Sequence, residues 1–260
     1  MAHGLVSTGV SFPDGTTRNT AMGTGAAVTR AYDGYMAVAH TSPPYTTVYG
    51  HDHSILNALP DPSVLPTGLG RGTAFSPDGT YLSVAHITSP FITIYKRSGD
   101  VFTKLANPSV LPASTGLGTA FSPDGTYLSV AHVTSPFITI YKRSGDTFTK
   151  LANPSVLPAS TGRGTAFSPD GTYLSVAHDN FPLITIYKRS GDTFTKLANP
   201  SVLPAGTGYG TAFSPDGTYL SVAHFNSPFI TIYAANEALK LPNLTANDAN
   251  LRYMIYTGEQ

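Results

Sequence analysis

Cysteine and tryptophan are both missing from this sequence of 260 residues, and charged residues make up only 12% of it. Without cysteine there are neither disulfides nor thiolate metal sites, and the redox compartment cannot be inferred. The formal net charge is zero, so nothing draws the chain electrostatically to DNA, RNA or an anionic membrane. We therefore expect no nucleic-acid partner.

Long apolar runs are missing as well. Proline, threonine or serine interrupts each apolar stretch well before membrane-spanning length, and the first nine residues lack the basic and apolar segments of a signal peptide. These absences predict a soluble chain without membrane insertion. Glycine and proline are abundant by contrast, with 25 and 21 residues, which is typical of many short strands joined by tight turns.

The dominant feature of the sequence is a tandem repeat with a step of 46 residues. The segment Gly-Thr-Ala-Phe-Ser-Pro-Asp-Gly-Thr-Tyr-Leu-Ser-Val-Ala-His begins at Gly72, Gly118, Gly164 and Gly210. An eroded fifth copy precedes them, lacks the Phe-Ser-Pro and ends at His40. Self-similarity at this period indicates a repeat architecture.

Each repeat predicts four strands. In the copy at 72–117 they are expected over 72–76, 81–86, 91–96 and 101–105, with Pro77-Asp78-Gly79 and Ser98-Gly99-Asp100 as hairpin turns. Four short antiparallel strands in about 40–50 residues are typical of a propeller blade. A blade buries both of its apolar faces only by packing between neighbours, so we expect these phenylalanines between blades: Phe75, Phe121, Phe167 and Phe213.

The predicted fold is therefore an all-β, five-bladed β-propeller of four-stranded antiparallel blades at 22–241. Residues 1–21 would be an N-terminal anchor or a ring-closing segment, and 242–260 a C-terminal extension. The last copy loses the Lys-Arg-Ser-Gly-Asp turn after Tyr233. Three segments remain candidates for its outer or closing strand: 238–241, 252–257 and 6–12.

Two resemblances follow from these motifs. The segment Ser-Pro-Asp-Gly-Thr-Tyr-Leu-Ser-Val-Ala-His resembles the blade motif of WD40-like and TolB-like propellers, although the Trp-Asp dipeptide of true WD40 repeats is missing. The segment from Gly9 to Ala21, with Phe-Pro-Asp-Gly-Thr at 12–16, resembles a segment of bacteriophage tail fibres. This second resemblance implies a virion surface protein that recognises host cells or decorates the particle.

Differences between copies concentrate in two loops. The copies at 72–117 and 118–163 differ at three positions, and those at 118–163 and 164–209 differ at six. Nearly all lie between the second and third strands or in the connection to the next blade, and in a propeller both loops emerge on one face. Loops on a rigid scaffold commonly carry binding residues, although neutral drift would also concentrate there. The candidate ligand-binding residues are Arg71, Leu117, Arg163, Tyr209, Asp179, Asn180, Phe181, Phe225 and Asn226.

Other patterns argue against catalysis and metal binding. A histidine ends the second strand of every copy, at positions 40, 86, 132, 178 and 224, but these residues stand a whole blade apart and cannot share one metal ion at Zn–N distances of about 2 Å. We expect them to be structural. Most aspartates occupy turns, and no carboxylate pair suited to glycoside hydrolysis is recognisable. The sequence predicts no catalytic residue, metal or cofactor.

The functional prediction from sequence is a non-enzymatic bacteriophage virion protein, a tail fibre, appendage or capsid decoration. Its propeller face would bind a host-surface glycan or another ligand, and its termini would bind other virion proteins or form a homo-oligomer. It would lie on the virion surface. The alternative is a bacterial propeller lectin or interaction scaffold in the cytoplasm or on the cell surface, and a propeller hydrolase ranks third.

Overall fold

The structure, a computed structural model, describes residues 10–11, 17–18, 34–52 and 55–234, in two units at 1–31 and 32–260. In the first unit β1 (Val10–Ser11) pairs antiparallel with β2 (Thr17–Arg18), and Val10 lies opposite Arg18. The chain between them contains Pro13-Asp14-Gly15.

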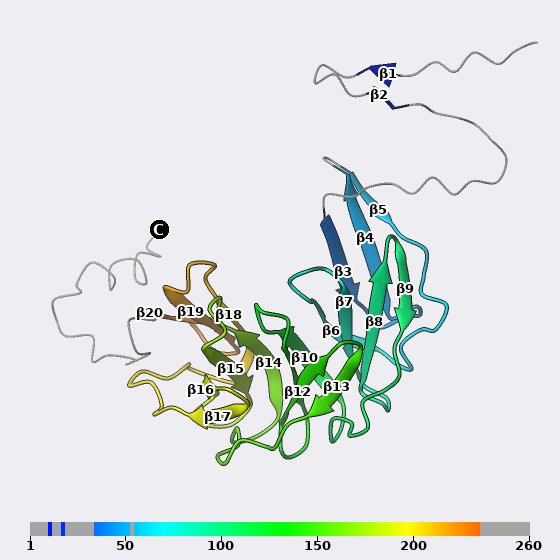
Figure 1. The fold of residues 1–260 in the computed structure, drawn as a ribbon. Coiled ribbons are helices and arrows are strands. Elements are labelled where there is room, and N and C mark those ends of the chain that lie inside the picture. The colour runs from blue at the N-terminus through cyan, green and yellow to red at the C-terminus, as the bar shows by residue number, and fades with distance from the viewer. Residues whose placement is uncertain (1–9, 12–16, 19–33, 53–54, 235–260) are drawn as a thin grey trace, which may run out of the picture. The chain divides into compact units, whose positions relative to one another are not determined.

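The second unit consists of five antiparallel sheets, and each sheet follows the order of its strands in the chain (Figure 1). Among the residues described, blades 1 and 5 have three strands each and blades 2 to 4 have four. Within the residues described, no helix occurs. The expected all-β fold of five blades in a propeller arrangement is thus confirmed. The blades are β3 (Gly34–Ala39), β4 (Thr46–Asp52) and β5 (Ile55–Ala58); β6 (Gly70–Phe75), β7 (Tyr81–His86), β8 (Ile92–Ser98) and β9 (Val101–Lys104); β10 (Gly116–Phe121), β11 (Tyr127–His132), β12 (Ile138–Ser144) and β13 (Thr147–Lys150); β14 (Gly162–Phe167), β15 (Tyr173–His178), β16 (Ile184–Ser190) and β17 (Thr193–Lys196); and β18 (Gly208–Phe213), β19 (Tyr219–His224) and β20 (Ile230–Ala234).

The strands lie where the repeat predicts them, with two local differences. The first strand of blade 2 begins two residues earlier than expected, because a bulge between Gly70 and Gly72 lets the chain continue its pairing with β7. The third strand begins at Ile92 because Phe91 has a φ of +66°, a left-handed turn conformation. The carbonyl oxygen of Phe91 accepts a hydrogen bond from the amide of His86 at 3.1 Å.

Apolar side chains fill the space between successive blades. Alternation along the second strand sends the Leu-x-Val row toward the preceding blade and the Tyr-x-Ser-x-Ala row toward the following one. Between blades 2 and 3, Ile92 and Ile94 meet Leu128, and Phe121 belongs to the same cluster. Phe75, Phe167 and Phe213 occupy equivalent places between the other pairs of blades, as predicted.

Polar contacts tie the same interfaces together. The hydroxyl of Ser83 in blade 2 is 3.0 Å from that of Thr119 in blade 3. Tyr81 donates a hydrogen bond of 2.6 Å to Asp146, and the guanidinium of Arg143 lies over the Tyr81 ring at 4.9 Å. Equivalent contacts join blades 3 and 4. Each interface therefore repeats one recognition pattern.

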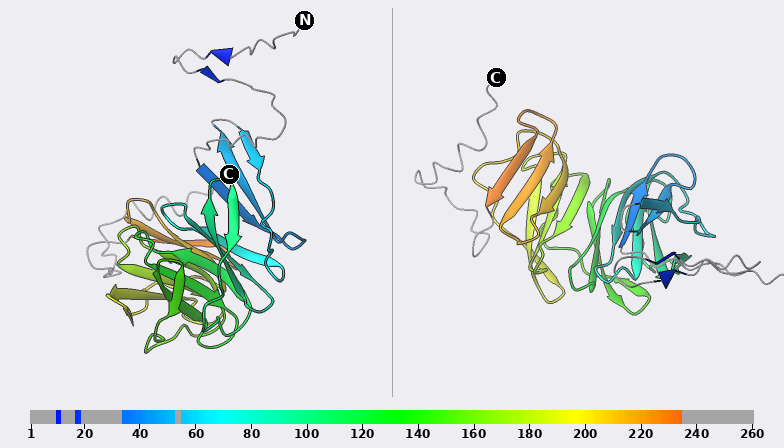
Figure 2. Two further views of the ribbon diagram at one scale, coloured as in Figure 1. Left: turned by 45° about the vertical axis from the view of Figure 1, so that its right-hand side comes forward. Right: turned by 90° about the horizontal axis from the view of Figure 1, so that it is seen from above.

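The five blades form an arc in which blades 1 and 5 occupy the two ends (Figures 1 and 2). The sequence left open which segment closes the ring. Residues 238–241 and 252–257 lie outside the described residues, and so does most of 6–12, of which 10–11 form β1. The assignment of a closing segment therefore stays a prediction.

Candidate ligand-binding site

The two variable loops of each blade lie together on one face. The hydroxyl of Thr115, in the connection to blade 3, donates to the carbonyl oxygen of Ile87 in the loop between β7 and β8, at 3.2 Å. The amide of Thr134, in the corresponding loop of blade 3, donates to Ser114 at 2.9 Å. The connection thus runs between the loops of successive blades, which supports the expectation that the variable positions share a face.

Buried tyrosines hold these connections in place. The hydroxyl of Tyr141 donates to the carbonyl oxygen of Val110 at 2.9 Å, and Tyr95 and Tyr187 make the same contact with Val64 and Val156. All three rings are completely buried, and burial raises the pKa of each hydroxyl well above its usual value. Such anchoring from the core makes the loop a rigid platform for its exposed side chains.

The residues at 71, 117, 163 and 209 lie at the start of the inner strands, where the backbones of neighbouring blades approach closely. A Cβ on Gly118 would stand 2.8 Å from the carbonyl oxygen of Arg163, and one on Gly164 would stand 2.8 Å from that of Tyr209. Glycine at these positions permits the close approach. Successive members of this set are therefore neighbours across the blade interfaces.

Four of the predicted residues form one connected group, here called the Arg163 cluster: Asp179, Arg163, Tyr209 and Phe225. The Nε and Nη2 atoms of Arg163 both donate to the Asp179 carboxylate, and the second contact is 3.2 Å long. The guanidinium lies over the Tyr209 ring of the next blade, 5.0 Å from its centroid. The Tyr209 ring in turn contacts Phe225 at 6.4 Å and an interplanar angle of 62°.

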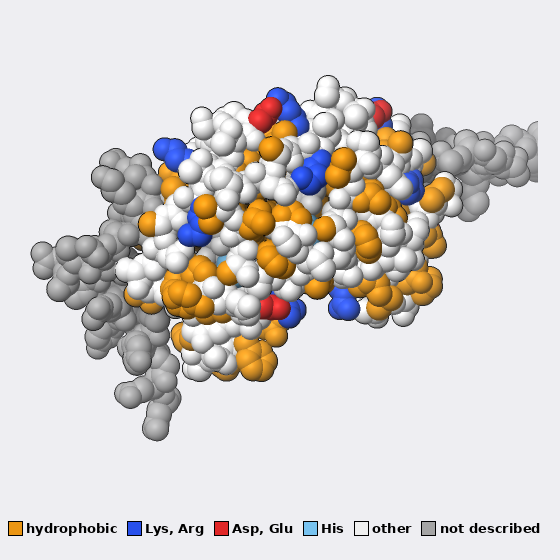
Figure 3. All heavy atoms as spheres, turned by 90° about the horizontal axis from the view of Figure 1, so that it is seen from below, with side chains coloured by type: hydrophobic (Ala, Val, Ile, Leu, Met, Phe, Trp, Pro, Cys, Tyr) orange, Lys and Arg blue, Asp and Glu red, His pale blue; other side chains and the backbone are white. Residues whose placement is uncertain are grey.

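The Arg163 cluster combines a charged pair with exposed aromatic rings. The side chains of Arg163 and Asp179 keep 34% and 28% of their surface exposed, and the hydrogen bond that Arg163 donates to Asp179 raises the pKa of Arg163. Phe225 is 65% exposed. Figure 3 shows acidic side chains beside basic ones on one face of the molecule. Lys96–Asp146 and Lys142–Asp192 are further ion pairs of the chain. In the Arg163 pair the cation itself lies over an aromatic ring, whereas in the other two pairs the carboxylate accepts a hydrogen bond from a tyrosine hydroxyl.

Each blade from 2 to 5 holds two of the variable residues sixteen positions apart, and their identities decide which blade carries an ion pair on this face. Arg163 lies opposite Asp179, and the equivalent positions hold Arg71 with Ile87, Leu117 with Val133, and Tyr209 with Phe225. Sequence comparison found all these positions but missed the pairing. The structure reveals it, because a bulge between Gly162 and Gly164 leaves Arg163 without a partner in the strand ladder, and its side chain contacts Asp179.

The remaining predicted site residues lie outside the Arg163 cluster. Arg71 is exposed and Leu117 half-buried. The amide of Asn180 donates to Ser160 at 2.8 Å, and the Asn226 side chain donates to the carbonyl oxygen of Ala205 at 2.9 Å. Phe181 is 72% exposed on the same loop as Asn180. The Asn226 side chain therefore orders its loop, whereas Asn180 uses its backbone amide as Thr134 does in blade 3, and Phe181 extends the exposed aromatic surface.

The repeated histidines are structural, as expected from their spacing. Nε2 of His132 is 3.0 Å from the hydroxyl of Thr139 on the adjacent strand, and four other histidines make the same contact. His86, His132 and His178 are completely buried, and burial lowers the pKa of each to about 4. In the part of the chain described, no group of three or more metal-ligating side chains occurs, and no helix is long and apolar enough to cross a membrane.

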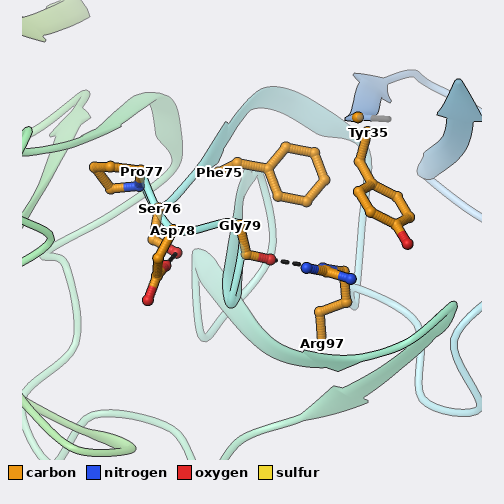
Figure 4. A pocket seen from close by; sticks show the side chains of 8 residues that line it. Tyr35, Phe75, Ser76, Pro77, Asp78, Gly79 and Arg97 are labelled. Atoms are coloured by element: carbon orange, nitrogen blue, oxygen red, sulfur yellow. Dashed lines mark hydrogen bonds between the residues drawn. The ribbon is translucent and has the colours of Figure 1, made fainter. Parts of the chain in front are cut away.

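The opposite face contains a hollow between blades 1 and 2 (Figure 4). Arg97 stacks on Tyr35 at 4.3 Å and donates to the carbonyl oxygen of Gly79 at 2.7 Å. Arg143 and Arg189 make equivalent contacts in the next two blades. Because these interactions belong to the repeated packing between blades, the hollow is a weaker candidate than the variable face.

Comparison with known proteins identifies the fold. The structure is similar to a putative 6-phosphogluconolactonase from Bacteroides uniformis, with a TM-score of 0.59, 19% identity, and coverage of 74% of this chain and 61% of that one. A putative 6-phosphogluconolactonase from Bacteroides fragilis gives a TM-score of 0.60, 19% identity and coverage of 77% and 63%. A protein from Lactobacillus plantarum gives 0.59, 20%, and 73% and 60%. No family model and no curated protein sequence matches.

These likenesses show a β-propeller fold, and the chain spans about three fifths of the length of the structures that it matches. They also correct the functional prediction from sequence. Two of the similar structures are named as putative 6-phosphogluconolactonases and none of the three as a virion protein, so the prediction of a phage tail fibre or capsid decoration is wrong. The Pro-Asp-Gly-Thr that suggested it also forms the turn of each blade from 2 to 5, and such turn chemistry is shared by unrelated β-proteins.

Proposed function

We propose that this chain binds a small cyclic polyol, such as a sugar or a sugar lactone, on its variable face. The observation that supports the proposal is the Arg163 cluster, in which an ion pair and two aromatic rings meet at partly exposed positions. Ligand sites typically combine apolar and aromatic surface with a few fixed polar groups. The other blades keep the same scaffold but lack this combination.

The chemistry of the pair selects the class of ligand. The Asp179 carboxylate accepts hydrogen bonds only, whereas the guanidinium of Arg163 offers five N–H donors, of which Asp179 engages two. Adjacent hydroxyl groups on a sugar ring both donate and accept, so they match an acid and a guanidinium side by side. An anionic ligand would meet repulsion from Asp179. The apolar C–H face of the ring would lie on Tyr209 or Phe225.

The chain itself supplies a conservative variant to test binding. In the double variant Arg163→Leu/Asp179→Val, the pair in blade 4 becomes the pair that Leu117 and Val133 already form in blade 3. We expect this variant to fold normally and to lose at least tenfold in affinity for a neutral monosaccharide or for gluconolactone, measured by isothermal titration calorimetry. Arg71→Leu is the matched control and should bind as the unmodified chain does.

Unchanged affinity in the double variant would contradict the proposed site. An unmodified chain that binds neither monosaccharides nor gluconolactone at millimolar concentration would contradict the proposed ligand class. A preference for gluconate over the neutral sugars would show that the guanidinium, and not the ion pair, selects the ligand.

Lactone hydrolysis is a second candidate, favoured by the names of the similar structures. The sequence predicts no catalytic residue because it lacks a carboxylate pair, but lactone opening needs only one base and one oxyanion donor. Asp179 would take a proton from water as the water oxygen attacks the carbonyl carbon, and Arg163 would stabilise the resulting oxyanion. The ring C–O bond then breaks, and the proton passes from Asp179 to the departing ring oxygen.

The opened hydroxy acid ionises and releases a proton, so a pH indicator follows the reaction. Hydrolysis of gluconolactone or its 6-phosphate above the spontaneous rate, and loss of that excess in Asp179→Asn, would support this candidate. A rate equal to the spontaneous one would contradict lactone hydrolysis by this chain without affecting the binding proposal.

A further inference from the structure

The two end blades of the arc leave matching apolar faces exposed. The outgoing face of blade 5 contains Tyr219, Ile230 and Ile232, and the incoming face of blade 1 contains Met36, Val38 and Leu56. Elsewhere in the chain the equivalents of these residues form the interfaces between blades. Each end therefore carries one half of an interface that the chain builds four times internally.

The outgoing face repeats the packing surface of the inner blades. Ile230 is 47% exposed, whereas its equivalents Ile92, Ile138 and Ile184 are completely buried against the next blade. The polar contact that crosses the inner blade interfaces is also incomplete on the outgoing face. The hydroxyls of Ser83, Ser129 and Ser175 each contact a threonine of the following blade, but Ser221 at the same position contacts only the carbonyl oxygen of Ala212 among the residues described.

The incoming face has the complementary character. Met36, Val38 and Leu56 correspond to Leu82, Val84 and Phe102, which blade 2 buries against blade 1. In blade 1 these three side chains are 41%, 42% and 49% exposed. None of the six residues on the two faces is charged, so their association would desolvate no charged side chain.

We propose that copies of this chain associate head to tail, the outgoing face of one copy packing on the incoming face of another. A second copy fits because it supplies the same face that blade 5 would meet if the repeats continued. Blades 1 and 5 stand at opposite ends of the arc (Figure 2), so the two faces of one chain are available to two different neighbours. Such a contact is heterologous, and each added copy leaves both kinds of face free at the ends of the assembly.

Sedimentation velocity over a wide concentration range tests the proposal on the full chain. The monomer mass is 27.3 kDa, and we expect the mass to rise with concentration past two copies. Two variants each disable one face: Ile230→Asp/Ile232→Asp and Met36→Asp/Val38→Asp. Val101→Asp is the control for an added charge, because Val101 is 64% exposed on the outer strand of blade 2.

Each double variant alone should remain a monomer, while Val101→Asp should assemble as the unmodified chain does. An equimolar mixture of the two double variants should form a complex of one copy each and no larger, because it contains one intact pair of faces. Cooperative melting of each variant confirms that it is folded. If Ile230→Asp/Ile232→Asp does not melt cooperatively, Ile230→Thr/Ile232→Thr replaces it.

Other occupants of the faces give different results. An unmodified chain that stays at the monomer mass at all concentrations, with no complex in the mixture, would overturn association between copies. Self-association on deletion of 235–260 would then assign the outgoing face to that segment. A truncated chain that remains monomeric would indicate that blades 1 and 5 close on each other within one chain.

Discussion

Single residues decide where the candidate site lies on a nearly uniform scaffold. Blades 3 and 4 share almost all of their residues, yet Leu117 with Val133 gives an apolar pair and Arg163 with Asp179 gives an ion pair. The backbone and the hydrogen bonds of the surrounding loops stay the same in both blades. Two substitutions are therefore enough to change the chemistry of a blade without changing its fold.

The buried histidines predict a loss of stability in mild acid. Burial lowers the pKa of His86, His132 and His178 from 6.5 to about 4. The unfolded chain therefore binds more protons than the folded one between these two values, and stability present above pH 6.5 falls as the pH drops toward 4. At pH 5 each histidine should cost about 2 kcal/mol of unfolding free energy relative to neutral pH.

Urea unfolding at pH 7.5 and pH 5 measures this loss, and His132→Gln isolates the contribution of one residue. The variant should lose about 2 kcal/mol less than the unmodified chain between the two pH values, whatever its stability at pH 7.5. Replacement of the partly exposed His51 by Gln is the control. An equal loss in His132→Gln and the unmodified chain would show that this histidine is not kept neutral by burial.

At the scale of the element, the repeat made most of the fold predictable. Identical copies fixed the strand boundaries to within two residues, and the Pro-Asp-Gly turns and the alternation of the second strand assigned its two faces. The bulge at Gly116 and the positive φ of Phe137 could not be read from the sequence, because both depend on contacts between one strand and the neighbouring loop. Arg163, which pairs with Asp179, is the extra residue of the equivalent bulge in blade 4, so the site residues were predicted but not their connection.

Equivalent positions in different blades should differ in their contribution to stability. Phe148 is buried at the interface between blades 2 and 3, in edge contact with Tyr81 at 5.9 Å and with Phe121 at 6.2 Å. Phe148→Ala should therefore lower the unfolding free energy by about 3–5 kcal/mol. Leu56 occupies the same position in blade 1 but is 49% exposed, so Leu56→Ala should cost less than about 1 kcal/mol.

Chemical denaturation of dilute protein compares the two variants, because dilution removes any contribution from association at the end face. Equal losses would mean that Leu56 is covered within its own chain, and would count against an exposed incoming face. A loss below about 1 kcal/mol in Phe148→Ala would contradict the packing of blade 3 on blade 2.

At the scale of the whole molecule, the copy number predicted the number of blades but not whether the ring closes. The angle between blades depends on how Tyr and Ile side chains pack on the Leu and Val of the next blade, and identical repeats are compatible with several angles. The similar structures are longer than this chain. The side chains exposed on blades 1 and 5 are the ones that the repeat would bury against a further blade.

Hydrogen exchange should report this difference between the middle and the ends. In repeat architectures each unit is stabilised mainly by its neighbours. Among the residues described, blades 1 and 5 each pack on one blade, whereas the others pack on two. Amides of β11 and β15 should exchange slowest, and those of β3 and β20 should exchange faster, because the end blades open without unfolding the rest. Head-to-tail association adds a second expectation, since protection of β3 and β20 should rise with protein concentration while that of β11 does not change. Uniform protection at every concentration would instead indicate a closed ring in which each blade has two neighbours.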